Sequence, residues 1–254
     1  FTFDSTEADK GAVITVVLSG GDGTTTTSDP ATLTLDDPQP DVIVDGVWAV
    51  TEYDGPGGVT ADELYTAAIY PNSPTGFFFV EDAINLPDAG KDNFGRVGHF
   101  LFKPDTSGDY HFFIKSDDGS EVHVNPTAKP DGGFPDPTAQ EPNAFRTNWD
   151  NNNPYQEPGT VTETTQVPIP MVAGSYYPIT IVYKEGGGGD RFSLATRRVG
   201  DATPAADLLP IPASMIAYAF NSAGRELTVT PPDDVVVTEF QPASFTVDAT
   251  SFPE

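Results

Sequence analysis

The sequence predicts an all-β protein, and three observations support this fold class. The 254 residues include 24 glycines and 25 prolines, which interrupt helices and favour tight turns. Residues that favour strands are abundant, among them 17 phenylalanines and 9 tyrosines. Short segments that alternate apolar and polar residues recur between clusters of turn-forming residues. We therefore expect short strands joined by turns and very little helix.

The charge of the chain narrows the classes of partner. There are 38 acidic residues against 12 basic ones, a net charge of -26. Such a surface repels phosphate backbones and anionic membranes, so we expect no nucleic-acid partner. No apolar run approaches the roughly 20 residues that a membrane span needs, so we expect no membrane insertion. The acidity fits both solubility in salty surroundings and calcium binding through clustered carboxylates.

The sequence contains no cysteine, so it forms no disulfide and no zinc–thiolate site. Core packing and metal ions are then the available stabilisers. This composition fits bacterial surface proteins better than small secreted animal domains. We expect a secreted protein of the extracellular cell surface.

The two ends of the chain predict incomplete hairpins. Residues 12–18 and 31–35 alternate as strands around a glycine-rich turn, and residues 234–238 and 243–249 alternate as strands around the turn at 239–242. An isolated hairpin is marginal in water, so these strands need partners elsewhere in this chain or in another. We predict three parts: 1–40, 41–230 and 231–254.

The central part carries the densest strand pattern. The clearest predicted strands are residues 98–102, 110–114, 121–124, 167–169, 177–183 and 191–195. The stretch 126–160 is rich in proline and asparagine, which predicts loops.

The two end segments resemble immunoglobulin-like sandwich repeats that are cut in the middle. Residues 8–13 resemble the corner before strand F, residues 31–35 resemble strand G, and residues 233–249 resemble strands A and B of the next repeat. Val13 stands where this family has a tyrosine.

Two blocks of the central part carry a second resemblance. Residues 102–122, which include Ser116-Asp117-Asp118-Gly119, resemble the signature of the protective-antigen-type domain. That domain is a β-sandwich of toxins, glycosidases and flocculin-like or GLEYA-like adhesins. Residues 173–190 are similar to the closing hairpin of the same family. The resemblance spans about residues 42–200 and implies a central β-sandwich of this type.

The motif predicts a metal site. Adjacent strand residues point to opposite faces, so Asp117 and Asp118 can hold one ion only where the backbone leaves strand geometry. The resemblance implies a cis peptide bond between them, with further oxygens from Glu185, Gly187 and Gly189. The acidic Glu185 replaces the amide usual in the yeast adhesins and should tighten calcium binding. The alternative is that residues 116–119 form only a polar turn.

The asparagine-rich loop predicts a ligand contact. Trp149 lies among amide side chains that include Asn151, with Tyr155 nearby, and an aromatic plane beside amides suits a sugar. We expect Trp149, Asn151, Tyr155 and Asp190 to bind a ligand above the calcium ion. A loop anchored by a buried tryptophan is the alternative.

Other motifs point away from catalysis. The glycines at 186–189 are not followed by the Lys-Ser/Thr pair of a phosphate loop, and no Gly-x-Ser-x-Gly elbow is present. His99, His111 and His123 lie on three successive predicted strands, where scattered single histidines are commoner than a metal cluster. Paired carboxylates carry no information in so acidic a chain. We expect a protein that is not an enzyme.

These observations predict a calcium-dependent carbohydrate-binding adhesion module of a bacterial surface protein. Its partner would be a glycan or a neighbouring surface protein. One alternative is the structural repeat of a filament or stalk, assembled head to tail through strand exchange of the terminal segments. Another is an accessory domain of a secreted glycosidase.

Overall fold

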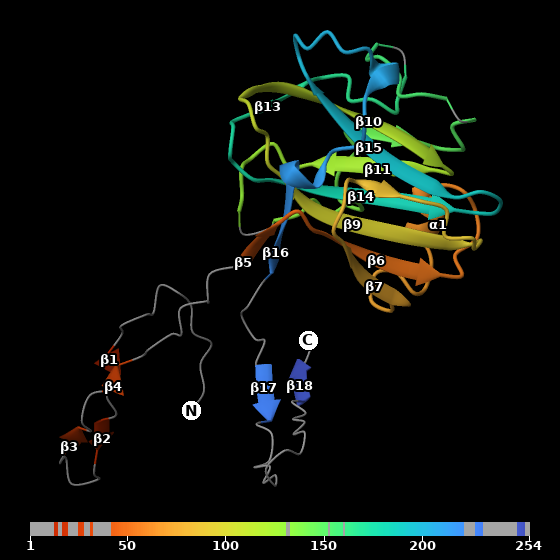
Figure 1. The fold of residues 1–254 in the computed structure, drawn as a ribbon. Helices are drawn as coiled ribbons and strands as arrows, with labels where there is room; N and C mark the ends of the chain where they lie inside the picture. Colours follow the sequence, from red (N-terminus) through yellow and green to blue (C-terminus); the bar gives the residue numbers. More distant parts are fainter. Residues whose placement is uncertain are drawn as a thin grey trace, which may run out of the picture. The chain divides into compact units, whose positions relative to one another are not determined.

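The fold is that of a computed structural model (Figure 1), which describes residues 42–220 apart from 131–132, 152 and 160. Outside that range it describes only the short strands β1–β4, β17 and β18. Residues 1–39 and residues 40–254 form separate compact units. None of the described helices is both long and apolar enough to cross a membrane.

The first unit contains two short antiparallel pairs. Strand β1 (Val13–Ile14) pairs with β4 (Ala31–Thr32), and β2 (Val17–Ser19) pairs with β3 (Thr25–Thr27). The β1–β4 pair agrees with the predicted hairpin between residues 12–18 and 31–35, whereas β3, the partner of β2, was not predicted.

Near the other end of the chain, β17 (Leu227–Thr230) pairs with β18 (Asp248–Ser251). The sequence did not predict this pairing. The predicted strand 234–238, and most of the one at 243–249, lie outside the described residues. The immunoglobulin-like likeness of both ends therefore stays a prediction.

Residues 42–220 form an antiparallel sandwich of two sheets, as the sequence predicts. The larger sheet has the order β12 (Ala144–Arg146), β11 (Ser120–Val124), β14 (Tyr177–Glu185), β9 (Phe94–Phe102), β16 (Ile216–Phe220) and β5 (Val42–Asp45). Strand β9 also pairs with β6 (Trp48–Asp54), which pairs with β7 (Gly76–Val80).

The smaller sheet has the order β13 (Ile169–Met171), β10 (Gly108–Asp117), β15 (Arg191–Arg198) and β8 (Asn85–Leu86). Five of the six clearest predicted strands are thus confirmed, each longer than predicted, whereas the strand predicted at 167–169 is observed at 169–171. The described helices are the single turn α1 (Ala61–Tyr65) and two 3-10 turns, η2 (Ala205–Asp207) and η3 (Ala213–Met215), so the expectation of little helix is confirmed.

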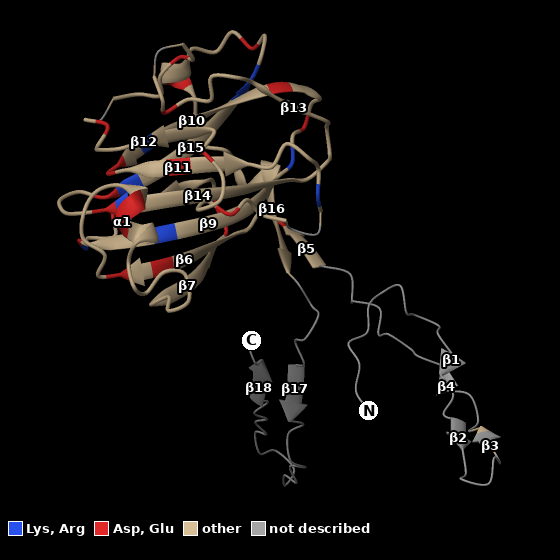
Figure 2. Ribbon diagram, turned by 180° about the vertical axis from the view of Figure 1, so that it is seen from behind, with Lys and Arg blue, Asp and Glu red and all other residues tan. Residues whose placement is uncertain are grey.

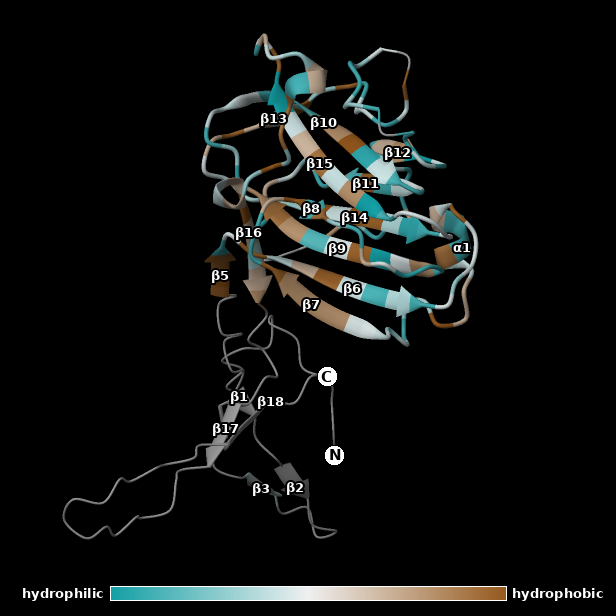
Figure 3. Cartoon of the chain, turned by 45° about the vertical axis from the view of Figure 1, so that its right-hand side comes forward, coloured by the Kyte–Doolittle hydropathy of each residue, from teal (hydrophilic) through white to brown (hydrophobic). Residues whose placement is uncertain are grey.

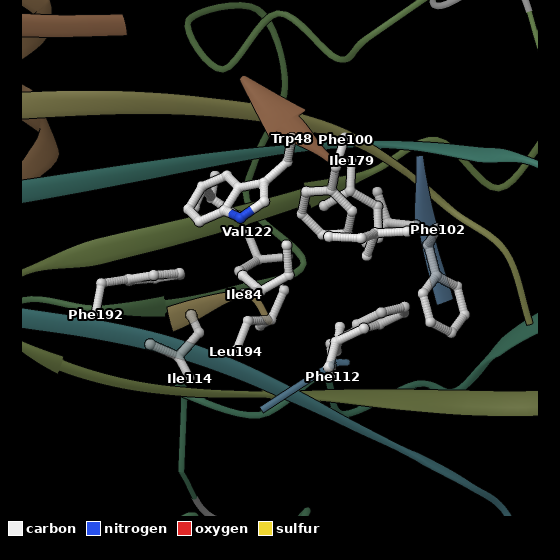
Figure 4. Packing of buried hydrophobic residues seen from close by; sticks show 14 of the residues in the cluster. Trp48, Ile84, Phe100, Phe102, Phe112, Ile114, Val122, Ile179, Phe192 and Leu194 are labelled. Atoms are coloured by element: carbon white, nitrogen blue, oxygen red, sulfur yellow. The ribbon is translucent and has the colours of Figure 1, made fainter. Parts of the chain in front are cut away.

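The core fills the space between the two sheets. Figure 4 shows Trp48, Phe100 and Ile179 of the larger sheet facing Phe112 and Leu194 of the smaller one. All five are fully buried. Each such side chain contributes about 1.5–3 kcal/mol by leaving water. The alternation of strand side chains therefore fixes the register of every strand that contributes to this core.

Loops cover part of the outer face of the larger sheet. All nine residues of β14 are buried, including outward-facing Thr180, whose hydroxyl donates to the carbonyl of Pro135 at 2.8 Å. At the other margin, β5 and β7 are rich in hydrophobic residues, which are brown in Figure 3, and several of their side chains are exposed. Val42 is 55% exposed and Phe77 is 56% exposed. The alternation of apolar and polar residues therefore predicts burial best near the centre of the sheet.

Matched leucine substitutions test this core. We expect Leu194→Ala to lower the free energy of unfolding by about 2–5 kcal/mol, because the shorter side chain leaves a cavity between the two sheets. Leu209→Ala should change it by less than about 0.5 kcal/mol, because Leu209 is 81% exposed. Urea unfolding of both variants gives the comparison, and equal losses would contradict the described packing.

Candidate metal centre

The candidate site lies where the chain twice crosses from one sheet to the other. The turn at Asp117–Gly119 leads from β10 in the smaller sheet to β11 in the larger. The loop 186–190 leads from β14 in the larger sheet to β15 in the smaller. The two crossings are adjacent because Asp117 pairs with Arg191 and Ser120 pairs with Tyr183. Sheet register therefore brings together residues that lie about 70 positions apart.

Three carboxylates converge at these crossings. One oxygen each of Asp117, Asp118 and Glu185 lies within 4.8 Å of the others. Within the described part of the chain, this is the one group of three or more acidic or histidine ligands that lies so close together. The peptide bond between Asp117 and Asp118 is cis, which confirms the geometry that the family resemblance implied.

Glycines let the backbone segments approach at this corner. A Cβ on Gly119 would lie 2.3 Å from the carbonyl oxygen of Val59, and Gly119 donates its N–H to that oxygen at 2.9 Å. A Cβ on Gly186 would lie 2.9 Å from the carbonyl oxygen of Gly58. The segment before α1 therefore packs directly on both crossings, and larger residues would push it away.

The carboxylates are poorly compensated. Glu185 is fully buried, and its Oε1 has no hydrogen-bond partner among the described residues. Burial, with added repulsion from Asp118 and Asp117, raises the pKa of Glu185 to about 7. Burial also raises the pKa of Asp117 above its ordinary value. The oxygen without a donor and the raised pKa values are what a cation site shows when only protein atoms are counted.

Two basic residues partly balance this charge. Lys184 is fully buried, with its Nζ donating to the carbonyl of Gly58 at 2.8 Å. Arg191 Nη1 lies 3.4 Å from Asp117 Oδ2, and its Nη2 pairs with Asp150. Sequence reasoning missed both residues, because a charged residue at a strand end is usually solvated. The alternation of Tyr183, Lys184 and Glu185 gave no sign that all three are buried.

The glycine loop lies beside the carboxylates. Gly186 donates its N–H to Asp118 Oδ2 at 3.1 Å. A Cβ on Gly189 would lie 4.0 Å from Asp117 Oδ2, and one on Gly187 would lie 3.7 Å from Asp92 Cγ. Gly189 is thus next to the cluster, whereas the described contact of Gly187 is with Asp92. The predicted ligand roles of their carbonyl groups stay predictions.

The asparagine-rich loop adjoins the cluster. The N–H of Asp150 donates to the carbonyl of Ser116 at 3.0 Å, and its carboxylate pairs with Arg191. Trp149 is 50% exposed, so it does not anchor the loop in the core. Asn151 is also exposed, and its φ of 52° is the left-handed conformation that asparagine tolerates. Both side chains remain open to a ligand.

Tyr155 and Asp190 are placed differently from the prediction. Tyr155 is 6% exposed, packs against Phe113, and donates its hydroxyl to Ser193 Oγ at 2.8 Å. Asp190 is 2% exposed and faces Asp88. Their burial favours structural roles, because the hydrophobic cluster and the β14–β15 loop enclose them.

The three histidines are scattered, as the commoner alternative predicted. His111 lies on β10 and contacts the carbonyl of Thr165 at 2.6 Å. His123, on β11, contacts Glu121 at 3.0 Å. His99, on β9, packs against Phe134. They form no common site, because His111 lies in the smaller sheet, whereas His99 and His123 lie in the larger one with β14 between them and contact different partners.

The wider field at this corner is negative. Figure 2 shows acidic residues on α1 and at the neighbouring strand ends. Two of them, Asp62 and Glu63, lie in the first turn of α1. Such a field attracts cations and disfavours anionic ligands.

Comparisons with known proteins agree with this geometry. Residues 97–198 match the GLEYA domain family. This segment begins in β9, ends in β15 and includes both sheet crossings. No curated protein matches the chain.

The chain is also similar to solved structures. The A domain of epithelial adhesin 9 from Candida glabrata, in complex with Galβ1-3GlcNAc, is 14% identical with a TM-score of 0.50, covering 74% of this chain and 98% of its own. The PA14 domain of the MpAFP antifreeze protein is 16% identical, with coverages of 72% and 96% and a TM-score of 0.47. The PA14 sugar-binding domain of an RTX adhesin is 15% identical, with coverages of 70% and 99% and a TM-score of 0.43. The likeness to the adhesin 9 domain shows a common all-β sandwich fold.

The site residues fit a hard divalent cation. Three carboxylates supply the oxygen ligands that calcium prefers, and one of their oxygens has no donor among the described residues. A cation placed there would offset the burial and the added repulsion that together raise the pKa of Glu185. The donors contain neither sulfur nor imidazole, so softer transition metals are disfavoured.

The pH dependence of stability tests the raised pKa of Glu185. The folded chain holds this proton up to about pH 7, whereas the unfolded chain releases it near the ordinary value of 4.5. The native state thus binds more protons between these values, and its stability falls as pH rises through them. The quantity to measure is the melting temperature of Glu185→Gln minus that of the wild type, in chelator. This difference should increase as the pH rises from 4.5 to 7, because only the wild type loses stability from the Glu185 proton.

Glu81→Gln is the matched control, because Glu81 is exposed. Its melting temperature should follow that of the wild type across the same range. A constant difference between Glu185→Gln and wild type would contradict the raised pKa.

Proposed function

We propose that this chain is a calcium-dependent carbohydrate-binding module of an extracellular adhesion protein. The observation that carries the proposal is the convergence of Asp117, Asp118 and Glu185 at the two sheet crossings, with the buried Glu185 Oε1 lacking a donor among the described residues. A cation bound at this position would lie at the surface beside the loop that presents Trp149.

Calcium is the cation that this ligand set favours. It takes six to eight oxygens and tolerates irregular geometry. The three carboxylates, with the carbonyls of Gly187 and Gly189, would provide about five of them. Water or vicinal sugar hydroxyls would complete the set, and the bound ion would supply the positive charge that holds those hydroxyls.

A glycan is the ligand class that the surroundings favour. The GLEYA match spans both crossings, and the adhesin 9 domain that shares the fold binds Galβ1-3GlcNAc. Trp149 offers an exposed aromatic face, and Asp150 and Arg191 tie its loop to Asp117. An apolar ring face beside a cation suits a sugar, which presents hydroxyls on one side and C–H groups on another.

The proposal is one of binding without catalysis, at a cell surface. The buried carboxylates lie close enough together to share one cation. The acidic, cysteine-free composition and the adhesin-like fold support an extracellular place. The bacterial source inferred from the composition, and the alternative of a filament built by strand exchange, stay predictions.

Removing two of the carboxylates tests the metal and the glycan together. We expect Asp117→Asn with Asp118→Asn to weaken calcium binding at this site by about 100-fold or more, since both changes remove charge from the ligand set. Glycan binding should be lost with it. Calorimetry with calcium and a glycan array with and without chelator give the two measurements.

The matched control is Asp105→Asn with Asp109→Asn, which removes the same charge from two exposed positions. This control should bind calcium and glycan as the wild type does. Glycan binding that persists in chelator would show that the metal is not required. Unchanged calcium binding by the Asp117→Asn, Asp118→Asn variant would contradict the assignment of the metal site.

The tryptophan tests where the glycan lies. Trp149→Ala should weaken glycan binding about tenfold, the equivalent of ~1.4 kcal/mol, because an aromatic face is lost. The melting temperature should barely change, because the side chain is 50% exposed. Val167→Ala, at a position 78% exposed, is the control for loss of a surface apolar group. A large drop in melting temperature with intact binding would place Trp149 in a structural role.

A further inference from the structure

A second pair of carboxylates lies on the other side of the glycine loop. Strand β8 pairs with β15 so that Leu86 lies opposite Phe192 and Asn85 lies opposite Ser193. The same antiparallel register, continued by two residues, places Asp88 opposite Asp190. Like charges in directly opposite positions destabilise a strand pair, so this arrangement needs a compensating group.

The carboxylate of Asp190 is buried and incompletely satisfied. Asp190 is 2% exposed, and its Oδ1 accepts the N–H of Ala89. Its Oδ2 is buried and receives no hydrogen bond from the described residues. The Asp88 carboxyl lies within hydrogen-bonding reach of Asp190, but at neutral pH it brings an acceptor and no donor. A buried carboxylate oxygen facing another carboxylate indicates that a cation or a proton lies between them.

The basic side chains near this pair are engaged elsewhere. Lys91 Nζ lies 2.5 Å from Glu52 and 2.6 Å from Asp54. Arg96 Nε lies 2.7 Å from Glu52, with its guanidinium over the ring of Phe94. Moving Lys91 to Asp190 would leave Asp54 without its ion pair, and moving Arg96 would take it from Glu52 and from the ring of Phe94.

We propose that Asp88 and Asp190 bind a second divalent cation, calcium in an extracellular setting, distinct from the one proposed at Asp117, Asp118 and Glu185. Gly189 separates the two positions, since a Cβ on it would lie 4.0 Å from both Asp88 Oδ2 and Asp117 Oδ2. Asp88 is exposed, so water completes the coordination from outside. With two protein carboxylates, the affinity falls in the range of extracellular calcium modules, a Kd of about 10⁻⁴–10⁻³ M.

The cation would fasten two loops at one end of the sandwich. Asp88 belongs to the segment after β8, and Asp190 ends the glycine loop that follows Glu185. The Asp92 carboxylate joins the same two segments by accepting the N–H of Gly188 at 3.1 Å. A cation between Asp88 and Asp190 would therefore hold the glycine loop in place whether or not the first cation binds. The proposal does not depend on glycan binding.

Calcium stoichiometry of the full chain tests the second site. The chelator-treated protein is titrated with calcium by calorimetry at about 0.15 M salt, where exposed charges are screened. We expect the wild type to bind two ions and Asp88→Asn to bind one, with the tighter site kept. Asp88→Asn is isosteric and keeps the oxygen that accepts the Gly90 N–H at 2.7 Å. Asp105→Asn, at an exposed aspartate outside both clusters, should still bind two.

Further variants separate this proposal from the proposed function. Asp117→Asn with Asp118→Asn should lose the tighter ion and keep the weaker one. If that variant still binds two ions, the first site is wrong and the Asp88 result is unaffected. If Asp88→Asn folds poorly, as judged by circular dichroism, Asp190→Asn replaces it, because an amide at 190 can donate to Asp88. The second site is overturned if the wild type binds a single ion or if Asp88→Asn still binds two. A proton shared between the two carboxyl groups would then explain their proximity.

Discussion

Like-charge repulsion at the two sheet crossings is the constraint on which the candidate site depends. The sandwich core fixes where these crossings lie, because each large apolar side chain between the sheets contributes about 1.5–3 kcal/mol and the core cluster contains many of them. The fold therefore forms with a charge imbalance at one corner, where burial, with added repulsion from Asp118 and Asp117, raises the pKa of Glu185.

Two basic side chains of the protein reduce this charge imbalance. Lys184 lies buried next to Glu185, and Arg191 is shared between Asp117 and Asp150. The sharing has a structural consequence, because it couples the acidic cluster to the loop that presents Trp149. A ligand that contacts this tryptophan would thus meet a loop held in place by the same charges that would hold a cation. Affinity for a glycan and affinity for a metal would then be linked.

Both proposed cation positions lie along one short loop. Residues 186–190 donate a backbone N–H to Asp118 at one end and carry the buried Asp190 at the other. Glycine suits position 186 because a Cβ there would lie 2.9 Å from the carbonyl oxygen of Gly58, and it suits position 188 because the φ of 114° disfavours other residues. Carboxylates from β10, from the end of β14 and from the segment after β8 border this loop. The loop therefore has acidic partners on both sides, and the proposed cations would hold it in order.

The sequence by itself determined the all-β class, five of the six clearest central strands and the acidic motif, because these follow from alternation and local turn chemistry. It also indicated Asp117, Asp118 and Glu185, through a family resemblance that joins two separate blocks. Tertiary structure alone decided that Tyr155 is buried against Phe113 and that Trp149 is exposed, since both lie in a loop without periodicity. It also decided that Lys184 is buried and that Asp190 faces Asp88. These outcomes depend on strand register and on which sheet each strand joins, and pairings between distant residues leave no signal in a single sequence.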